Sequence, residues 1–256
     1  MEHPDASTLA VWLHEQTAAF AAAAEGPDLD TWVPTCPEWR MRDLVAHVGR
    51  AHRWAVELVA SGSTEMPPQP EVTLPATPGE RTGWLVEGAE RLVEAVERVG
   101  PDTPVWSFLG RRTPAFWLRR MLHDTTVHHA DAALTAGIGY RPEPALAADT
   151  LTEGLELMAA VVESGINPTL AELRGDGETL AFVPDETGVE GWVVTRTPDG
   201  LAWTRGGGDA HVTVAGPMAS LLLVFSRRTR PDDASGVRVT GRRPLLDHWL
   251  ERTAFG

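Results

Sequence analysis

The chain has 256 residues, of which 43% are hydrophobic and 23% are charged, a composition typical of a globular protein with one large or two modest domains. Its net charge of −14 argues against nucleic-acid binding, which needs a basic face to neutralise phosphates. No apolar run approaches the roughly 20 residues of a membrane span, and the N-terminus lacks a secretory pattern. We therefore expect a cytoplasmic protein that binds neither nucleic acid nor membrane.

Helical periodicity dominates the first two-thirds of the chain. The predicted helices cover about 7–24, 41–60, 80–99, 113–137 and 144–164. Thr35 and Glu38 offer a capping box one turn before the second helix. A loop rich in Pro, Ser and Thr follows that helix, and Pro114 stands in the first turn of the fourth. We expect four of these helices to form a bundle.

The pattern changes after Asn167 to short β-branched segments with period two. The predicted strands cover 179–183, 192–197, 201–205, 211–215 and 236–240, and two further helices are expected at about 217–227 and 244–252. The turn signal Thr197-Pro198-Asp199-Gly200 predicts a hairpin. The predicted fold class is therefore α plus α+β: an N-terminal four-helix bundle in residues 1–166, followed by a small α+β domain in residues 167–256.

Asp124 and His128 are the strongest candidate site residues. They lie four residues apart on the fourth predicted helix, so both fall on the face that Trp117 and Met121 continue. A carboxylate and an imidazole at core positions need a partner, either a divalent metal or each other, unless this turn faces solvent. His47 adds a third candidate ligand, because it falls on the inward stripe of the second helix. Three ligands with open coordination positions are typical of catalytic metal sites.

The other candidates near this motif are weaker. His52 lies on a flanking row and is the weaker candidate, whereas His123 is turned about 100° from Asp124 and is not expected to be a ligand. Asp131 points away from the Asp124 face, where it orients a ligand, caps the helix or faces solvent. Cys36 is the only cysteine, which excludes an intramolecular disulfide, and we expect a structural role for it. All 22 basic residues are arginine, which excludes lysine chemistry.

Two segments resemble the motifs of a known family. Cys36-Pro37-Glu38-Trp39, followed by the segment 42–47, is similar to the first motif of the mycothiol-dependent maleylpyruvate isomerase family, which belongs to the DinB-like metal-binding bundles. The segment 123–131 is similar to the second motif, in which the family usually has Glu at the position of Asp124. The helix that runs into Phe225-Ser226-Arg227, with the strands around it, is similar to the family's sterol-carrier-like C-terminal domain.

The resemblance implies a metal, a thiol cofactor and a reaction. The metal is a divalent ion, zinc before others, held by His47, Asp124 and His128, and the cofactor is mycothiol. Arg227, or its neighbour Arg228, would hold a substrate carboxylate. Metal binding turns the thiol into a thiolate that adds to a small unsaturated acid, which isomerises, or is transferred to a small electrophile.

This mechanism describes an isomerase or a thiol S-transferase. Two alternatives remain open from the sequence. One is a DinB-like divalent-metal-binding protein with a different reaction. The other is a small-molecule binding module, in which the C-terminal domain holds an apolar ligand and the metal is structural or absent.

Overall fold

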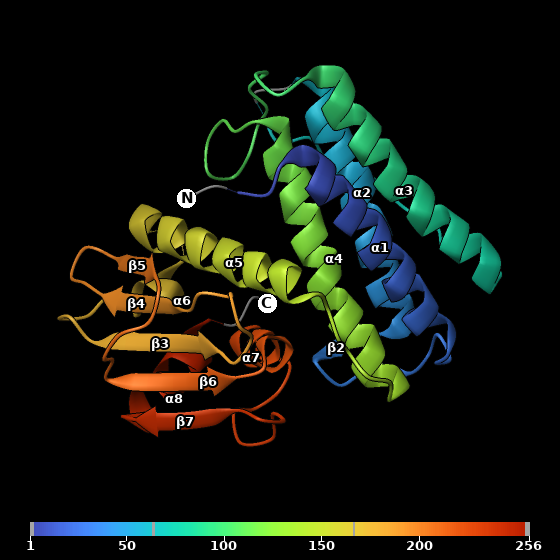
Figure 1. Cartoon of the computed structure of the whole chain (residues 1–256). Helices are drawn as coiled ribbons and strands as arrows, with labels where there is room; N and C mark the ends of the chain where they lie inside the picture. The colour runs from blue at the N-terminus through green and yellow to red at the C-terminus, as the bar shows by residue number, and fades with distance from the viewer. Residues whose placement is uncertain (1–2, 63–64, 166, 254–256) are drawn as a thin grey trace. The chain divides into compact units, whose positions relative to one another are not determined.

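The structure is a computed structural model that describes residues 3–62, 65–165 and 167–253. The chain divides into two compact units, Met1–Tyr140 and Arg141–Gly256 (Figure 1). The first unit is a bundle of helices, and the second combines helices with a five-stranded sheet, which confirms the predicted fold class. In the described ranges, no helix is long and apolar enough to cross a bilayer.

Four long helices form the first unit: α1 (Ala6–Glu25), α2 (Met41–Ser61), α3 (Pro78–Val99) and α4 (Pro114–Ala136). Both α1 and α2 pack against α3 and α4, which is the arrangement of a four-helix bundle. Side-chain caps begin two of the helices. Asp5 accepts the backbone N–H of Thr8 at the start of α1, and Thr77 and Glu80 form a capping box at the start of α3.

The connection from α1 to α2 contains two antiparallel strands, β1 (Trp32–Val33) and β2 (Cys36–Arg40). No pattern in the sequence predicted this hairpin. Because β2 runs directly into α2, the residue before the helix is Arg40, whose N–H donates to the Asp43 carboxylate at 2.8 Å. The expected capping box of Thr35 and Glu38 is therefore wrong, since both residues precede the helix and belong to the hairpin.

The helices α2 and α3 approach each other closely at Gly49. A Cβ atom at this position would overlap the indole ring of Trp84, so the close packing requires glycine. The Arg53 guanidinium stacks on the same ring, 4.2 Å from its centroid, and donates a hydrogen bond of 2.9 Å to the Trp84 carbonyl. This contact joins α2 to α3, and His47 lies two residues before the glycine.

In the residues that the structure describes, the second unit contains four helices and five strands: α5 (Pro144–Ser164), α6 (Pro168–Ala171), β3 (Thr179–Pro184), β4 (Trp192–Arg196), β5 (Leu201–Arg205), β6 (Val212–Gly216), α7 (Met218–Phe225), β7 (Arg238–Gly241) and α8 (Arg243–Arg252). The strand order is β5-β4-β3-β6-β7, with β3 and β6 parallel and the other pairs antiparallel. The predicted β4–β5 hairpin is confirmed, and Thr197 N–H donates to the Gly200 carbonyl at its turn.

The helix α5 belongs to the second unit, which differs from the expected division after residue 166. It packs against α6, α7 and β5, and its Leu151 and Leu155 lie in the same buried core as Phe182 and Trp192 of the sheet. A helical pattern shows that one face is buried, but it does not show which unit covers that face. The boundary between the compact units therefore lies between Tyr140 and Arg141, ahead of α5.

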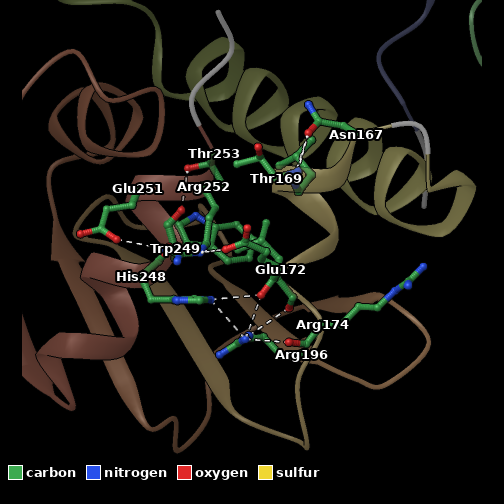
Figure 2. A network of polar contacts seen from close by, with 12 residues as sticks. Asn167, Thr169, Glu172, Arg174, Arg196, His248, Trp249, Glu251, Arg252 and Thr253 are labelled. Atoms are coloured by element: carbon green, nitrogen blue, oxygen red, sulfur yellow. Dashed lines mark hydrogen bonds and ion pairs between the residues drawn. The ribbon is translucent and has the colours of Figure 1, made fainter.

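Figure 2 shows the polar network that anchors the turn after α6. The guanidinium of Arg196 on β4 donates to the carbonyls of Glu172, Leu173 and Arg174, at 3.3, 2.9 and 2.6 Å. The side chain of Glu172 in turn accepts a 2.8 Å hydrogen bond from Arg252 on α8. One arginine thus satisfies three carbonyls at a helix end, which ties that turn to the sheet.

Candidate metal centre

Three side chains with metal-binding atoms come together where α2 and α4 pack in the first unit. His47 comes from α2, and Asp124 and His128 come from successive turns of α4. His47 Nε2 lies 3.4 Å from Asp124 Oδ2, and His128 Nε2 lies 3.9 Å from the same oxygen. The three ligand atoms all lie within 4.8 Å of one another. The structure brings the predicted residues together, and their binding of a metal stays a prediction.

The kind and spacing of these atoms suit a divalent ion. Two ligand atoms that each lie about 2 Å from a tetrahedral zinc are separated by roughly 3.3 Å, close to the 3.4 and 3.9 Å found here. Asp124 has a shorter side chain than the Glu that the resemblance led us to expect, yet its Oδ2 faces both imidazoles. Its other oxygen, Oδ1, lies 3.4 Å from Arg120 Nη2. The residues present therefore fit a metal with two histidines and one carboxylate.

The Asp124 carboxyl is ionised. Burial raises its pKa, but His128, His47 and Arg120 outweigh burial and hold the pKa well below its usual range. Its negative charge lies beside two imidazole nitrogens in a site that is mostly shielded from solvent. A cation placed among these three groups would meet the charge and the lone pairs that it requires.

Asp131 lies next to this site. The helical pattern predicted that its side chain points away from the Asp124 face, but the side chain contacts His128. Its side chain is fully buried, so the solvent-facing role is excluded, and its Oδ2 lies 2.8 Å from His128 Nδ1. Thr35 donates to Oδ1 at 2.6 Å, and Cys36 Sγ lies 3.6 Å from Oδ2. The spacing of three residues between His128 and Asp131 was the available signal, because such residues are neighbours on a helix surface. The contribution of the hairpin left no signal in the sequence.

Cys36, His128 and Asp131 also form a second group of potential ligands within 4.8 Å. In that group the carboxylate and the imidazole already share a hydrogen bond of 2.8 Å. The first group is therefore the better metal site, since its donor atoms face one another at distances that leave room for an ion.

Aromatic rings flank the two imidazoles. The indole of Trp39, at the end of β2, lies 4.8 Å from the His47 ring and 5.7 Å from the His128 ring, measured between centroids. Trp117, near the start of α4, is 1% exposed and belongs to the core, as expected. Trp39 is half-buried, so it forms one wall of the site while remaining in reach of solvent.

The other histidines nearby have different surroundings. His52 is 1% exposed, and its Nε2 lies 2.8 Å from Thr125 Oγ1. Burial is the main reason why the pKa of His52 falls from 6.5 to about 4, so it is neutral at pH 7. His123 is also buried. Within the described residues, neither histidine belongs to a group of three potential metal ligands.

Arg227 lies at the end of α7 in the second unit. Its φ of 62° makes it the one non-glycine residue with a positive φ in the described parts of the chain. The side chain is exposed and lines a surface hollow of about 460 Å³ between the ends of α7 and α8. Arg228 is half-buried, and its Nη1 donates to the Ser226 carbonyl at 2.8 Å. The carboxylate-binding role of Arg227 stays a prediction.

Part of the chain matches the model of a known family. Residues 12–133 match the family model described as the mycothiol maleylpyruvate isomerase N-terminal domain. Two crystal structures of the mycothiol-dependent maleylpyruvate isomerase, a mutant and the unmutated enzyme, match with TM-scores of 0.57 and 0.56. Each has 14% identity over 93% of both chains, so this likeness is one of fold. None of the curated proteins matches the chain in sequence.

Proposed function

The chain belongs to the mycothiol maleylpyruvate isomerase family through its residues 12–133, and on this premise we propose that it is a metal-dependent enzyme that uses mycothiol. The reaction is the isomerisation of a small unsaturated acid or the transfer of the thiol to a small electrophile. One observation carries the proposal: His47, Asp124 and His128, from two helices of the family's domain, direct their ligand atoms toward one another. Zinc is the ion that this set of two imidazoles and one carboxylate favours first.

The proposal gives a part to each candidate residue. His47, Asp124 and His128 would hold the ion, whose charge lowers the pKa of a bound thiol so that a thiolate exists near neutral pH. Arg120 keeps Asp124 Oδ1 occupied and so leaves Oδ2 for the ion. The Trp39 ring excludes water from one side of the imidazoles. Arg227 would bind the carboxylate of the acid substrate, for which a guanidinium fork is suited.

Metal analysis of ligand variants tests the proposal. We expect the purified wild-type chain to bind zinc stoichiometrically, and His47→Ala and Asp124→Ala each to lose most of it, because two ligands are insufficient for tight binding. His52→Gln is the matched control, since His52 lies on the same helix and outside the ligand group. It should retain the metal. If both ligand variants keep as much zinc as the wild type, the metal site is refuted.

Chelation separates the proposed enzyme from a binding module. A metal-dependent enzyme loses activity on chelation and regains it when zinc is restored, whereas a module with a structural metal or none has no activity to lose. Activity that persists in the metal-free protein would contradict the proposal.

A further inference from the structure

We propose that Asp131 is a positioning residue that fixes the tautomer and the ring orientation of His128, and that the β1–β2 hairpin holds Asp131 in place through Thr35 and Cys36. The part that concerns the metal rests on the proposed function. The part that concerns the imidazole rests on the hydrogen bonds alone and applies to the metal-free protein as well.

The carboxylate of Asp131 is buried and fully engaged. It is 0% exposed, and a buried carboxylate without partners would be strongly unfavourable. Its Oδ1 accepts the Thr35 hydroxyl at 2.6 Å. Its Oδ2 lies 2.8 Å from His128 Nδ1 and 3.6 Å from Cys36 Sγ. Three potential donors converge on this carboxylate, and acceptance from all three requires a proton on each partner atom.

That requirement determines the tautomer of His128. A carboxylate oxygen that accepts a hydrogen bond from the ring places the ring proton on Nδ1. The lone pair of the ring then lies on Nε2, the nitrogen that is 3.9 Å from Asp124 Oδ2 and belongs to the ligand group. In the opposite tautomer, a proton would occupy the position from which Nε2 binds an ion. Asp131 therefore prepares His128 to be a ligand before any metal arrives.

The hairpin gives this arrangement its rigidity. Thr35 and Cys36 lie 96 and 95 residues before Asp131 in the chain, yet both contact its carboxylate. Figure 1 shows β2 beside the C-terminal half of α4, where this contact is made. The same hairpin places the Trp39 ring 5.7 Å from the His128 ring, measured between centroids. The imidazole is thus restrained by a hydrogen bond at Nδ1 and by an aromatic ring, and both restraints depend on a segment far away in sequence.

Two readouts on the full-length chain test the proposal. Long-range proton–nitrogen correlation spectra of the metal-free protein should show the Nδ1–H tautomer of His128 in the wild type and its loss in Asp131→Ala. Zinc titration should show an affinity about 10- to 100-fold lower for Asp131→Ala. Asp131→Asn should retain the tautomer and much of the affinity, because its amide oxygen still accepts from Nδ1. This rescue separates positioning from a general loss of structure.

The hairpin is tested by Thr35→Val, with Thr135→Val as the matched control. Thr135 donates to the backbone carbonyl of Asp131 at 2.7 Å and leaves the carboxylate untouched. We expect Thr35→Val to lower zinc affinity by less than Asp131→Ala does, and Thr135→Val to leave it unchanged.

The outcomes separate this inference from the proposed function. If Asp131→Ala keeps the Nδ1–H tautomer, or binds zinc within about twofold of the wild type, the role of Asp131 is overturned. If Asp131→Ala does not fold, equal affinities of Thr35→Val and Thr135→Val overturn it. If the wild type itself binds no zinc, the proposed function fails, and the tautomer of His128 alone decides the role of Asp131.

Discussion

The burial of His52 makes the stability of the metal-free protein depend on pH. This side chain is 1% exposed, and burial is the main cause that lowers its pKa from 6.5 to about 4. Between these values the unfolded chain binds a proton that the folded protein does not bind. The stabilising contribution is therefore complete above about pH 6.5, decreases as the pH falls, and is lost by about pH 4.

The two pKa values give the size of this effect. With 6.5 in the unfolded chain and about 4 in the folded protein, proton binding lowers the free energy of unfolding by about 2 kcal/mol between pH 7 and pH 5. Replacement of His52 by Gln removes this titration while keeping an amide that can donate to Thr125. His129, whose pKa burial also lowers to about 4, is present in both proteins and cancels in the comparison.

Urea unfolding with a chelator present measures the difference directly. We expect the wild type to lose about 2 kcal/mol more unfolding free energy than His52→Gln when the pH is lowered from 7 to 5. Chelation removes any contribution of bound metal to the pH dependence. Equal losses in the two proteins would refute the reasoning, because the buried imidazole would then titrate normally.

Three further outcomes follow from particular contacts. Gly49→Ala should lower the free energy of unfolding by about 1–3 kcal/mol, because its methyl group would displace the Trp84 ring. Gly83→Ala, with open space around its Cβ, should be neutral or up to about 1 kcal/mol stabilising. Equal effects of the two variants on urea unfolding would contradict the close approach of α2 and α3. Arg227→Gly should relieve the left-handed backbone and raise the free energy of unfolding by up to about 1 kcal/mol, and it should also raise KM for an unsaturated acid. A KM that instead responds to Arg228→Ala would assign the carboxylate to the neighbour. The proposed metal-dependent activity should be lost on treatment with a chelator and restored by added zinc, and full activity after chelation would contradict the proposal.

The long helices were predictable because their sequence patterns are local. The predicted bounds of α5, 144–164, are those of the structure, since a proline begins the helix and Gly165, with a positive φ, follows its end. The β1–β2 hairpin was missed for the opposite reason: a strand of two residues has no period that a sequence pattern can reveal. The unit to which α5 belongs depends on what covers its apolar face, and that is a property of the folded chain.

The candidate site was likewise predictable only in part. His47, Asp124 and His128 could be chosen because each falls on the inward stripe of a periodic helix. The role of Asp131 depends on Thr35 and Cys36, which lie at the hairpin and reach it only after folding. Helical spacing alone could place Asp131 beside His128, but it could not show that the carboxylate is buried and oriented by a distant segment.

Calorimetric titration of mycothiol tests the central claim most directly, because it measures the interaction of the thiol with the metal centre before any substrate is known. We expect binding to the zinc-loaded wild type, and much weaker binding to the metal-free protein and to His47→Ala. Absence of binding to the zinc-loaded protein would contradict the use of mycothiol. Equal binding with and without the metal would contradict the role of His47, Asp124 and His128 in activating the thiol.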